Sequence, residues 1–299
     1  MGKRAWRRVD GVLLLDKASG MTSNAALQVA RRLFSAAKAG HTGTLDPLAT
    51  GLLPLCFGEA TKFSADLLSA DKCYEADLRF GVTTDSGDAD GSVAEQRPVN
   101  FSPSDLERVL EGFRGPIMQV PPMYSALKYA GRPLYELARQ GVEIEREARS
   151  VTIHELALLD IGDSRCRLRV ACSKGTYIRS LAMDIGEALG CGAHLTALRR
   201  TVVGPLVIGD AVSLDRLSEM TDEERVASLL PPDALLQSLP EVGLDPVASI
   251  RFGHGNSVSI AEELSRGAGL RRVYGEGRFL GLGEVDDSGN VKPRRLVCA

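Results

Sequence analysis

The sequence predicts an α+β fold with a central, mainly antiparallel sheet flanked by helices. Residues 72–82 alternate between apolar and polar, which is the period of a half-buried strand. Residues 150–161 and 165–172 are two further strand-like runs joined by a short polar turn, and together they predict a hairpin. Apolar residues at helical spacing over residues 22–34, after a capping threonine or serine, predict one of the flanking helices.

Other elements of the same fold follow in chain order. The apolar run GVLLL at residues 11–15 predicts a buried strand. Helices are expected at residues 59–70 and 103–113, the second opening at a Pro-Ser-Asp sequence. A further helix begins near Thr176 and ends at the glycines of residues 190–192.

The length of 299 residues suggests about two domains. Residues 213–245 are acidic and helical in pattern, with proline breaks, and we place the domain boundary at their end. Residues 249–299 are rich in glycine and turn pairs, and GLGEVDDSGNVKPRRL has the form of a hairpin. This change of character predicts a small C-terminal β-barrel that follows a larger domain of residues 1–245.

Composition limits the compartment and the chemistry. No stretch contains the roughly 18 apolar residues that span a bilayer, and the basic N-terminus lacks the apolar run of a signal peptide, so we expect a cytoplasmic protein. The six cysteines form no CxxC pair and there are only four histidines, which argues against a structural zinc site. The net charge of −3 argues weakly against a nucleic-acid partner, but basic residues gather in separate clusters, so local fields decide.

Residues 40–54, GHTGTLDPLATGLLP, hold one carboxylate, Asp46, among small and apolar residues. Pro47 fixes its own φ and keeps Asp46 out of the helical region. The stretch therefore predicts a loop that holds one acid in place. The alternative is that Asp46 is an ordinary turn or helix-cap residue, since Asp before Pro commonly begins such structures.

Two other stretches call for a choice between readings. Residues 83–93, TTDSGDADGSV, suggest a calcium loop, but the closing acid of an EF-hand would fall at Arg97, so we reject the metal and expect an acidic turn. Residues 119–141 interleave basic and aromatic side chains, which suits contact with RNA by stacking and phosphate binding, or an ordinary loop with solvated lysines and arginines. The residues concerned are Tyr124, Lys128, Tyr129, Arg132 and Tyr135.

The loop GHTGTLDPLATGLLP and the stretch SKGTYIRSLAMDIGEALGCGAHLTALRRTVVGPL resemble the TruB family of tRNA pseudouridine-55 synthases, and the resemblance extends over nearly the whole chain. It implies the pseudouridine synthase fold, a thumb-like insertion at about residues 119–150, and a PUA-like RNA-binding domain at residues 249–299. It also implies isomerisation of uridine to pseudouridine at position 55 in the T-loop of tRNA. The implied enzyme extrudes the base and needs no cofactor, no metal and no protein partner, and it acts as a monomer.

The resemblance also assigns residues. Asp46 would be the catalytic carboxylate, Arg179 its ion-pair partner, and Tyr74 the ring that stacks on the base. Tyr177 and Leu198 would line the uridine pocket. His41 would also contact the substrate. RNA contacts are implied for four more residues: Lys17, Tyr124, Lys128 and Arg132.

Composition alone leaves alternatives for these residues. Tyr74, Tyr177 and Leu198 also suit core packing, and Arg179 also suits a surface ion pair. Lys17 lies in DKASGMTS, where the family usually has proline in place of Ala18, and it also suits a solvated surface position. Two other functions stay open: an RNA-binding chaperone of tRNA folding with secondary catalysis, and a guide-RNA-dependent relative of the same fold.

Overall fold

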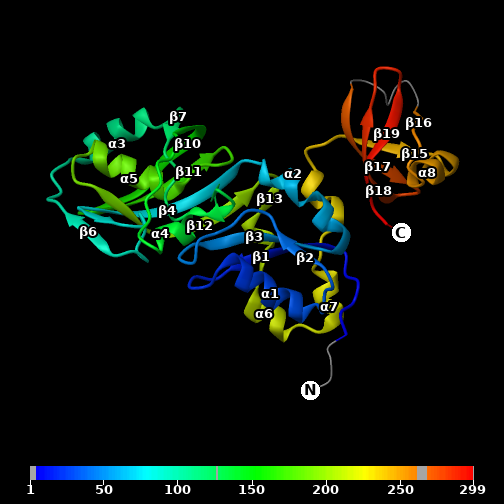
Figure 1. Ribbon diagram of the computed structural model, residues 1–299, viewed down its shortest axis with the longest axis horizontal. Helices are drawn as coiled ribbons and strands as arrows, with labels where there is room; N and C mark the ends of the chain where they lie inside the picture. Colours follow the sequence, from blue (N-terminus) through cyan, green and yellow to red (C-terminus); the bar gives the residue numbers. More distant parts are fainter. Residues whose placement is uncertain (1–4, 126, 261–267, 299) are drawn as a thin grey trace.

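A ten-stranded mixed sheet forms the centre of the protein in the computed structural model, which describes residues 5–125, 127–260 and 268–298 (Figure 1). The strand order is β14-β1-β3-β12-β4-β11-β10-β7, with β2 paired to β3 and β13 to β12. Only β1–β14 and β3–β12 are parallel among these described pairs, so the prediction of a mainly antiparallel sheet is confirmed. The strands are β1 (Gly11–Lys17), β2 (Ala39–His41), β3 (Thr50–Phe57), β4 (Lys72–Phe80), β7 (Gly115–Gln119), β10 (Arg149–Gly162), β11 (Arg165–Cys172), β12 (Ala193–Val203), β13 (Leu206–Val207) and β14 (Val212–Ser213).

The predicted period of β4 matches its burial. Tyr74, Ala76, Leu78 and Phe80 lie inward and join the main apolar core, while the residues between them are more exposed. The neighbours β11 and β12 pair with β4 on its two sides, in antiparallel register. Strand β4 therefore lies in the middle of the sheet, with one face on the core.

Helices cover that core face. Helix α5 (Ile178–Ala188) packs on β12 and β4, α3 (Pro103–Gly112) packs on α5 and β10, and α1 (Ser23–Leu33) packs on β2 and β3. The Thr22 side chain accepts from the Ala25 backbone N–H at the start of α1, as the capping signal predicts. The shorter helical elements are α6 (Leu214–Glu219), α7 (Asp222–Ala227), η2 (Ile208–Asp210) and η3 (Pro232–Leu236).

The single helix expected at residues 59–70 is wrong. The chain forms a 3-10 helix, η1 (Gly58–Phe63), and then a short α2 (Ser64–Leu68). The hydroxyls of Thr61 and Ser64 each donate to the carbonyl three residues earlier, at 2.7 and 3.1 Å, which favours the tighter winding.

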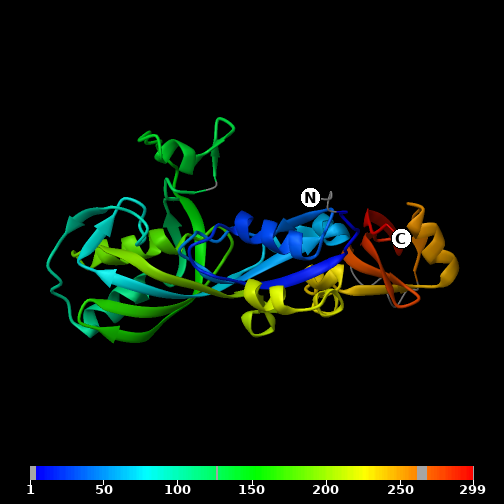
Figure 2. The ribbon, with the colours of Figure 1, turned by 90° about the horizontal axis from the view of Figure 1, so that it is seen from below.

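The segment between β7 and β10 projects from the body of the molecule and corresponds to the predicted thumb-like insertion (Figure 2). It contains the hairpin β8 (Lys128–Tyr129) and β9 (Arg132–Pro133), followed by α4 (Leu134–Ala138). The acidic turn of residues 83–93 joins the two strands of a second small hairpin, β5 (Val82–Thr84) and β6 (Val93–Gln96).

A separate five-stranded sheet lies at the C-terminal end, where the small β-barrel was predicted (Figure 1). Its order is β15-β17-β18-β19-β16, and α8 (Pro246–Gly253) packs on it. The first strand begins ahead of the expected boundary at residues 245–249, because β15 pairs in parallel with β17. The strands are β15 (Glu241–Leu244), β16 (Val258–Ser259), β17 (Gly269–Gly275), β18 (Arg278–Val285) and β19 (Asn290–Leu296).

The two sheets are joined through η1 and η3. The ring of Phe63 meets that of Phe279 edge-on, with centroids 5.4 Å apart. Lys62 donates to the Leu296 carbonyl at 2.9 Å, and the Cys298 N–H donates to Glu59 at 2.7 Å. The C-terminal sheet is thus fastened to the 3-10 helix that directly follows β3. In the part of the chain described, no helix is long and apolar enough to cross a membrane.

Candidate active site

Asp46 lies in the loop between β2 and β3, and buried neighbours hold that loop. The Ser23 hydroxyl accepts from the Leu45 N–H at 2.8 Å and donates to its carbonyl at 3.0 Å. Leu45 and Ala49 are buried on either side, while the Asp46 side chain keeps 39% of its surface exposed. No helix begins at Asp46, so the alternative of a helix cap is wrong. Asp46 does open a turn, because its carbonyl accepts from the Ala49 N–H at 3.1 Å. The loop leaves its carboxylate open to a substrate.

Lys17 binds the backbone of the Asp46 loop. Its side chain is entirely buried, and its ammonium donates to the carbonyls of Ala18 and Met21 at 2.8 Å and of Pro47 at 3.3 Å. Burial lowers the pKa of Lys17 to about 8, although the Asp46 charge opposes this change. Because its side chain is buried, Lys17 neither contacts RNA nor lies in solvent, so both expectations for this residue are wrong. Lys17 instead binds the backbone of the Asp46 loop from within the protein.

Arg179 is the ion-pair partner of Asp46. It lies in the first turn of α5 with 4% of its side chain exposed, and its Nε is 2.9 Å from Asp46 Oδ2 and 3.5 Å from Asp88 Oδ2. Its remaining nitrogens donate to the carbonyls of Ser86 at 2.8 Å and Tyr124 at 2.6 Å. Burial raises the pKa of Asp46, and the Arg179 charge and hydrogen bond lower it. Arg179 thus favours the ionised carboxylate.

Two tyrosines lie close enough to Asp46 for its charge to raise the pKa of each, in addition to the larger effect of burial. Tyr74 is on β4, opposite Arg200 of β12, and is nearly buried. Tyr177 precedes α5 and is held by Gln119, whose amide donates to the Tyr177 carbonyl at 3.0 Å and accepts from its N–H at 2.7 Å. Leu198, two residues before Arg200, is also nearly buried.

His41 ends β2 and is half-buried. Burial, and then the nearby Arg200 charge, lower the pKa of His41, so a neutral imidazole is favoured at this position. Its Nδ1 atom is buried and has no hydrogen-bond partner among the described residues. Any contact of His41 with a substrate would therefore use a neutral ring.

The other expected RNA-contact residues lie in the projecting segment. Lys128 and Arg132 are exposed on the β8–β9 hairpin, and the Arg132 guanidinium has a long contact of 3.9 Å to Glu136. Tyr124 is different, because its backbone carbonyl reaches Arg179. The base of this segment therefore contacts the Asp46 cluster through Arg179. Among the described residues, no hydrogen bond or ion pair joins Lys128 or Arg132 to this cluster. The cluster consists of Asp46, Tyr74, Asp88, Tyr177, Arg179, Leu198 and Arg200.

Sequence reasoning missed two members of this cluster. Asp88, in the acidic turn, is buried and accepts from the Ser86 hydroxyl at 2.5 Å in addition to facing Arg179. Arg200 is buried and donates to the Gly43 carbonyl in the loop at 3.2 Å. Asp88 lies in the acidic turn and Arg200 lies in the second motif, so both stretches were singled out from the sequence. Local sequence does not indicate which of several acids, or which of two adjacent arginines, points into the protein.

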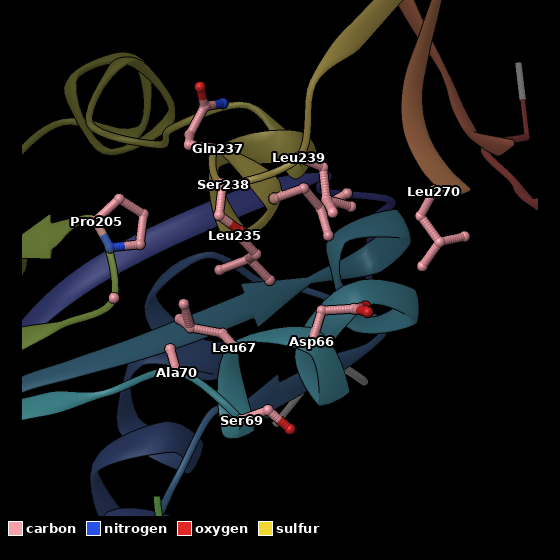
Figure 3. A pocket seen from close by; sticks show the side chains of 12 residues that line it. Asp66, Leu67, Ser69, Ala70, Pro205, Leu235, Gln237, Ser238, Leu239 and Leu270 are labelled. Carbon is pink, nitrogen blue, oxygen red and sulfur yellow. The ribbon is translucent and has the colours of Figure 1, made fainter. Parts of the chain in front are cut away.

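A pocket of about 480 Å³ lies elsewhere, between α2, η3 and the start of β17 (Figure 3). Its lining is mostly apolar, with Leu67, Leu235 and Leu239 facing the hollow. Among its described lining residues Asp66 alone carries a carboxylate, and this group is 3.6 Å from Arg295. Nothing in this pocket matches the open carboxylate and buried cation that Asp46 and Arg179 provide.

Comparisons with solved structures and family models agree with this fold. One structure is titled as an H/ACA RNP bound to a substrate RNA containing 2′-deoxyuridine. It matches with a TM-score of 0.71 at 23% identity, over 97% of this chain and 85% of the other. A second, titled as a Cbf5-Nop10-Gar1 complex, matches with a TM-score of 0.68 at 26% identity, over 92% and 78%.

Family models cover most of the chain. Residues 31–178 match the N-terminal domain of TruB family pseudouridylate synthases, residues 179–237 the tRNA pseudouridylate synthase B C-terminal domain, and residues 240–297 the C-terminal model of pseudouridine synthase II TruB. The tRNA pseudouridine synthase B of Dechloromonas aromatica is 63% identical over 99% of this chain and 98% of its own length. That of Aromatoleum aromaticum is 56% identical over 97% and 94%.

The fold and the matching relatives are those of pseudouridine synthases, which are isomerases. Within that class the chain belongs to the TruB family. The resemblance drawn from the two sequence motifs is confirmed.

Proposed function

We propose that this enzyme converts uridine to pseudouridine at position 55 in the T-loop of tRNA, with Asp46 as the catalytic carboxylate. One observation carries the proposal: a partly exposed carboxylate, Asp46, is ion-paired at 2.9 Å to a buried arginine, Arg179. The Asp46 charge also adds to the rise that burial causes in the pKa of Tyr74 and Tyr177. The names of the relatives in Dechloromonas and Aromatoleum support tRNA as the substrate. A tRNA substrate also agrees with the cytoplasmic location expected from composition.

The reaction breaks the bond between uracil N1 and ribose C1′, turns the base, and joins C5 to C1′. The proton lost from C5 is balanced by the one gained at N1, so the product is an isomer and no redox change occurs. Asp46 acts as nucleophile at the ribose, or as base in an elimination route. Arg179 keeps the carboxylate ionised and oriented for either route.

The target base must leave the RNA loop to reach Asp46. Unstacking costs a few kcal/mol, and a base stacked on an aromatic ring recovers about 1–3 kcal/mol. Tyr74 is proposed for this stacking, and Tyr177 and Leu198 for enclosing the detached uracil while it turns. His41 would contact the extruded nucleotide as a neutral donor or acceptor.

Most of the RNA affinity must then come from contacts to phosphate and to RNA shape. We assign these contacts to Tyr124, Lys128 and Arg132 of the projecting segment and to the C-terminal sheet. We also propose that residues up to about 240 form the catalytic domain and the rest an RNA-binding domain, which the place of β15 supports. The enzyme would act as a monomer, without a guide RNA or partner protein.

The decisive experiment incubates the pure protein with an unmodified tRNA transcript and maps pseudouridine by position. A transcript with cytidine at position 55 is the matched substrate control. We expect complete conversion at position 55 by the wild type. Asp46→Asn and Asp46→Ala should lose at least about a thousandfold in rate, since removing an essential catalytic group has effects of this size, and should keep tRNA affinity within a few-fold. Wild-type-like conversion by either variant would end the mechanism.

A further inference from the structure

Strand β12 carries two adjacent arginines that face opposite sides of the sheet. Arg199 is half-exposed, and its two terminal nitrogens bind the Asp16 carboxylate at 3.1 and 2.7 Å. Arg200 points inward and keeps only 1% of its surface exposed. Arg199 and Arg200 are thus adjacent arginines, one partly in solvent and the other buried.

Arg200 is bound by backbone carbonyls. Its Nε donates to the Leu52 carbonyl at 2.8 Å and its Nη2 to the Gly43 carbonyl at 3.2 Å. Within the described residues, no carboxylate comes within 4.0 Å of its guanidinium. A buried charge without a counterion is costly, and apolar residues of similar volume often serve stability equally well. Packing alone therefore gives no reason for an arginine here.

The ring opposite Arg200 supplies the reason. Tyr74 of β4 pairs with Arg200 of β12 in the sheet register, so the two side chains share one face as direct cross-strand neighbours. Burial raises the pKa of Tyr74, and the nearby Arg200 charge partly offsets this rise. The buried guanidinium therefore lies beside the ring on the same face of the sheet.

The same group fixes the loop. Gly43 lies three residues before Asp46, and its φ of +79° is the left-handed conformation that favours glycine. On the other side, Gly51 (φ +98°) lets β3 pass close to the Arg200 backbone, where an added Cβ would lie 2.3 Å from the Arg200 carbonyl oxygen. Arg200 is therefore held by β3 and in turn holds the entry to the Asp46 loop.

We propose that Arg200 is a positioning residue for uridine isomerisation, whose buried guanidinium holds the Tyr74 ring and the Gly43 end of the Asp46 loop in one fixed arrangement. This role rests on the proposed function. Arg200 touches neither the reacting atoms nor bulk solvent, so it acts through Tyr74 and the loop. Its loss should lower the rate of the bound complex and leave RNA affinity nearly unchanged, because small misplacements of reacting groups are costly in rate.

The test measures single-turnover rates with enzyme in saturating excess over tRNA transcript, so that weakened binding does not lower the rate. The variants are Arg200→Met, Arg200→Lys, Tyr74→Phe and the double variant Arg200→Met/Tyr74→Phe. Arg199→Met is the matched control, since it removes the neighbouring arginine from the other face of β12. The Kd for tRNA and the melting temperature are measured for each.

Arg200→Met should slow isomerisation by about tenfold to a hundredfold at a Kd within about threefold of wild type. Arg200→Lys should recover part of the rate, and Arg199→Met should stay within about twofold of wild type. The double variant should be no slower than the slower single variant, since residues that act through one contact have non-additive effects.

Three results would overturn the role. One is a wild-type rate in Arg200→Met, and another is additive losses in the double variant. If Arg200→Met fails to fold, a wild-type rate in Arg200→Lys overturns it as well, and a slower rate at unchanged Kd supports it. A wild-type enzyme that makes no pseudouridine would instead remove the proposed function, which separates the two failures.

Discussion

The Asp46 loop and the segment between β7 and β10 both carry predicted site residues, yet they are built differently. Buried donors hold the backbone of the Asp46 loop from several sides: Lys17, Ser23 and Arg200. The projecting segment has mainly local and exposed contacts, such as Arg132 with Glu136 and Arg139 over the Tyr135 ring at 5.6 Å. The difference teaches that the proposed catalytic group is held in place by the protein itself, while the proposed RNA-contact segment carries exposed charge with fewer supporting contacts.

The largest effect is expected where the two regions meet, at Arg179. Arg179→Gln removes the ion pair with Asp46 and leaves Asp88 buried without its cation, so we expect a loss of about 3–5 kcal/mol in unfolding free energy. Denaturant unfolding measures this loss. Arg167→Gln, which breaks an exposed pair with Asp77, is the matched control and should cost about 1 kcal/mol or less. Equal losses in the two variants would contradict the difference in burial.

The same substitution changes the pH dependence of activity. Burial raises the pKa of Asp46 and Arg179 lowers it, so activity falls as pH drops through this pKa and the carboxylate is protonated. Removing Arg179 raises the pKa further, and the acid limb of the single-turnover profile should move to higher pH. A limb that stays in place, or moves to lower pH, would show that Asp46 is not the titrating group.

A smaller effect is expected from backbone crowding at Gly51. An added Cβ would lie 2.3 Å from the Arg200 carbonyl oxygen and 2.8 Å from its nitrogen, so β3 and β12 must separate. Gly51→Ala should cost about 2–3 kcal/mol of stability and slow isomerisation together. Gly209→Ala, at a glycine with open space around its Cβ position, is the control and should be nearly neutral. If Gly51→Ala lowers stability but leaves the rate unchanged, the close contact between β3 and β12 does not position the site.

The smallest effects belong to the projecting segment. Lys128→Ala and Arg132→Ala should each weaken tRNA binding by a few-fold and reduce the salt dependence of log Kd by about one unit of slope. The single-turnover rate at saturation should stay unchanged, because neither side chain reaches the Asp46 cluster. Arg108→Ala on α3 is a control for the loss of an exposed charge. If either variant lowers the single-turnover rate and leaves the tRNA affinity unchanged, the projecting segment acts in the reaction and not in binding, contrary to this prediction.

The sequence predicted those features that depend on local pattern. The alternation in β4, the cap of α1 and the loop at Asp46 each follow from neighbouring residues, and each is present. The helix at 59–70 was wrong because hydroxyls of Thr61 and Ser64 compete for the backbone, and helical periodicity does not register this competition.

Lys17 and Arg200 show where sequence reasoning ends. A lysine or arginine is expected at the surface, and only the long-range meeting of β1, β3 and β12 turns these two inward. The partners of both are backbone carbonyls, which every residue has, so no residue type elsewhere in the sequence indicates the contact. Asp88 had a recognisable partner type, but Arg179 lies 91 positions away.

The seating of the C-terminal sheet on η1 has a consequence for substrate choice. Strand β3 runs from the Asp46 loop to η1 over eight residues, and the seven steps between its end residues span about 23 Å at about 3.3 Å each. Its length therefore helps to set the distance between the proposed catalytic carboxylate and the C-terminal sheet. We therefore expect the enzyme to select RNAs whose tertiary fold presents both contact points at that interval, largely independently of nucleotide identity between them.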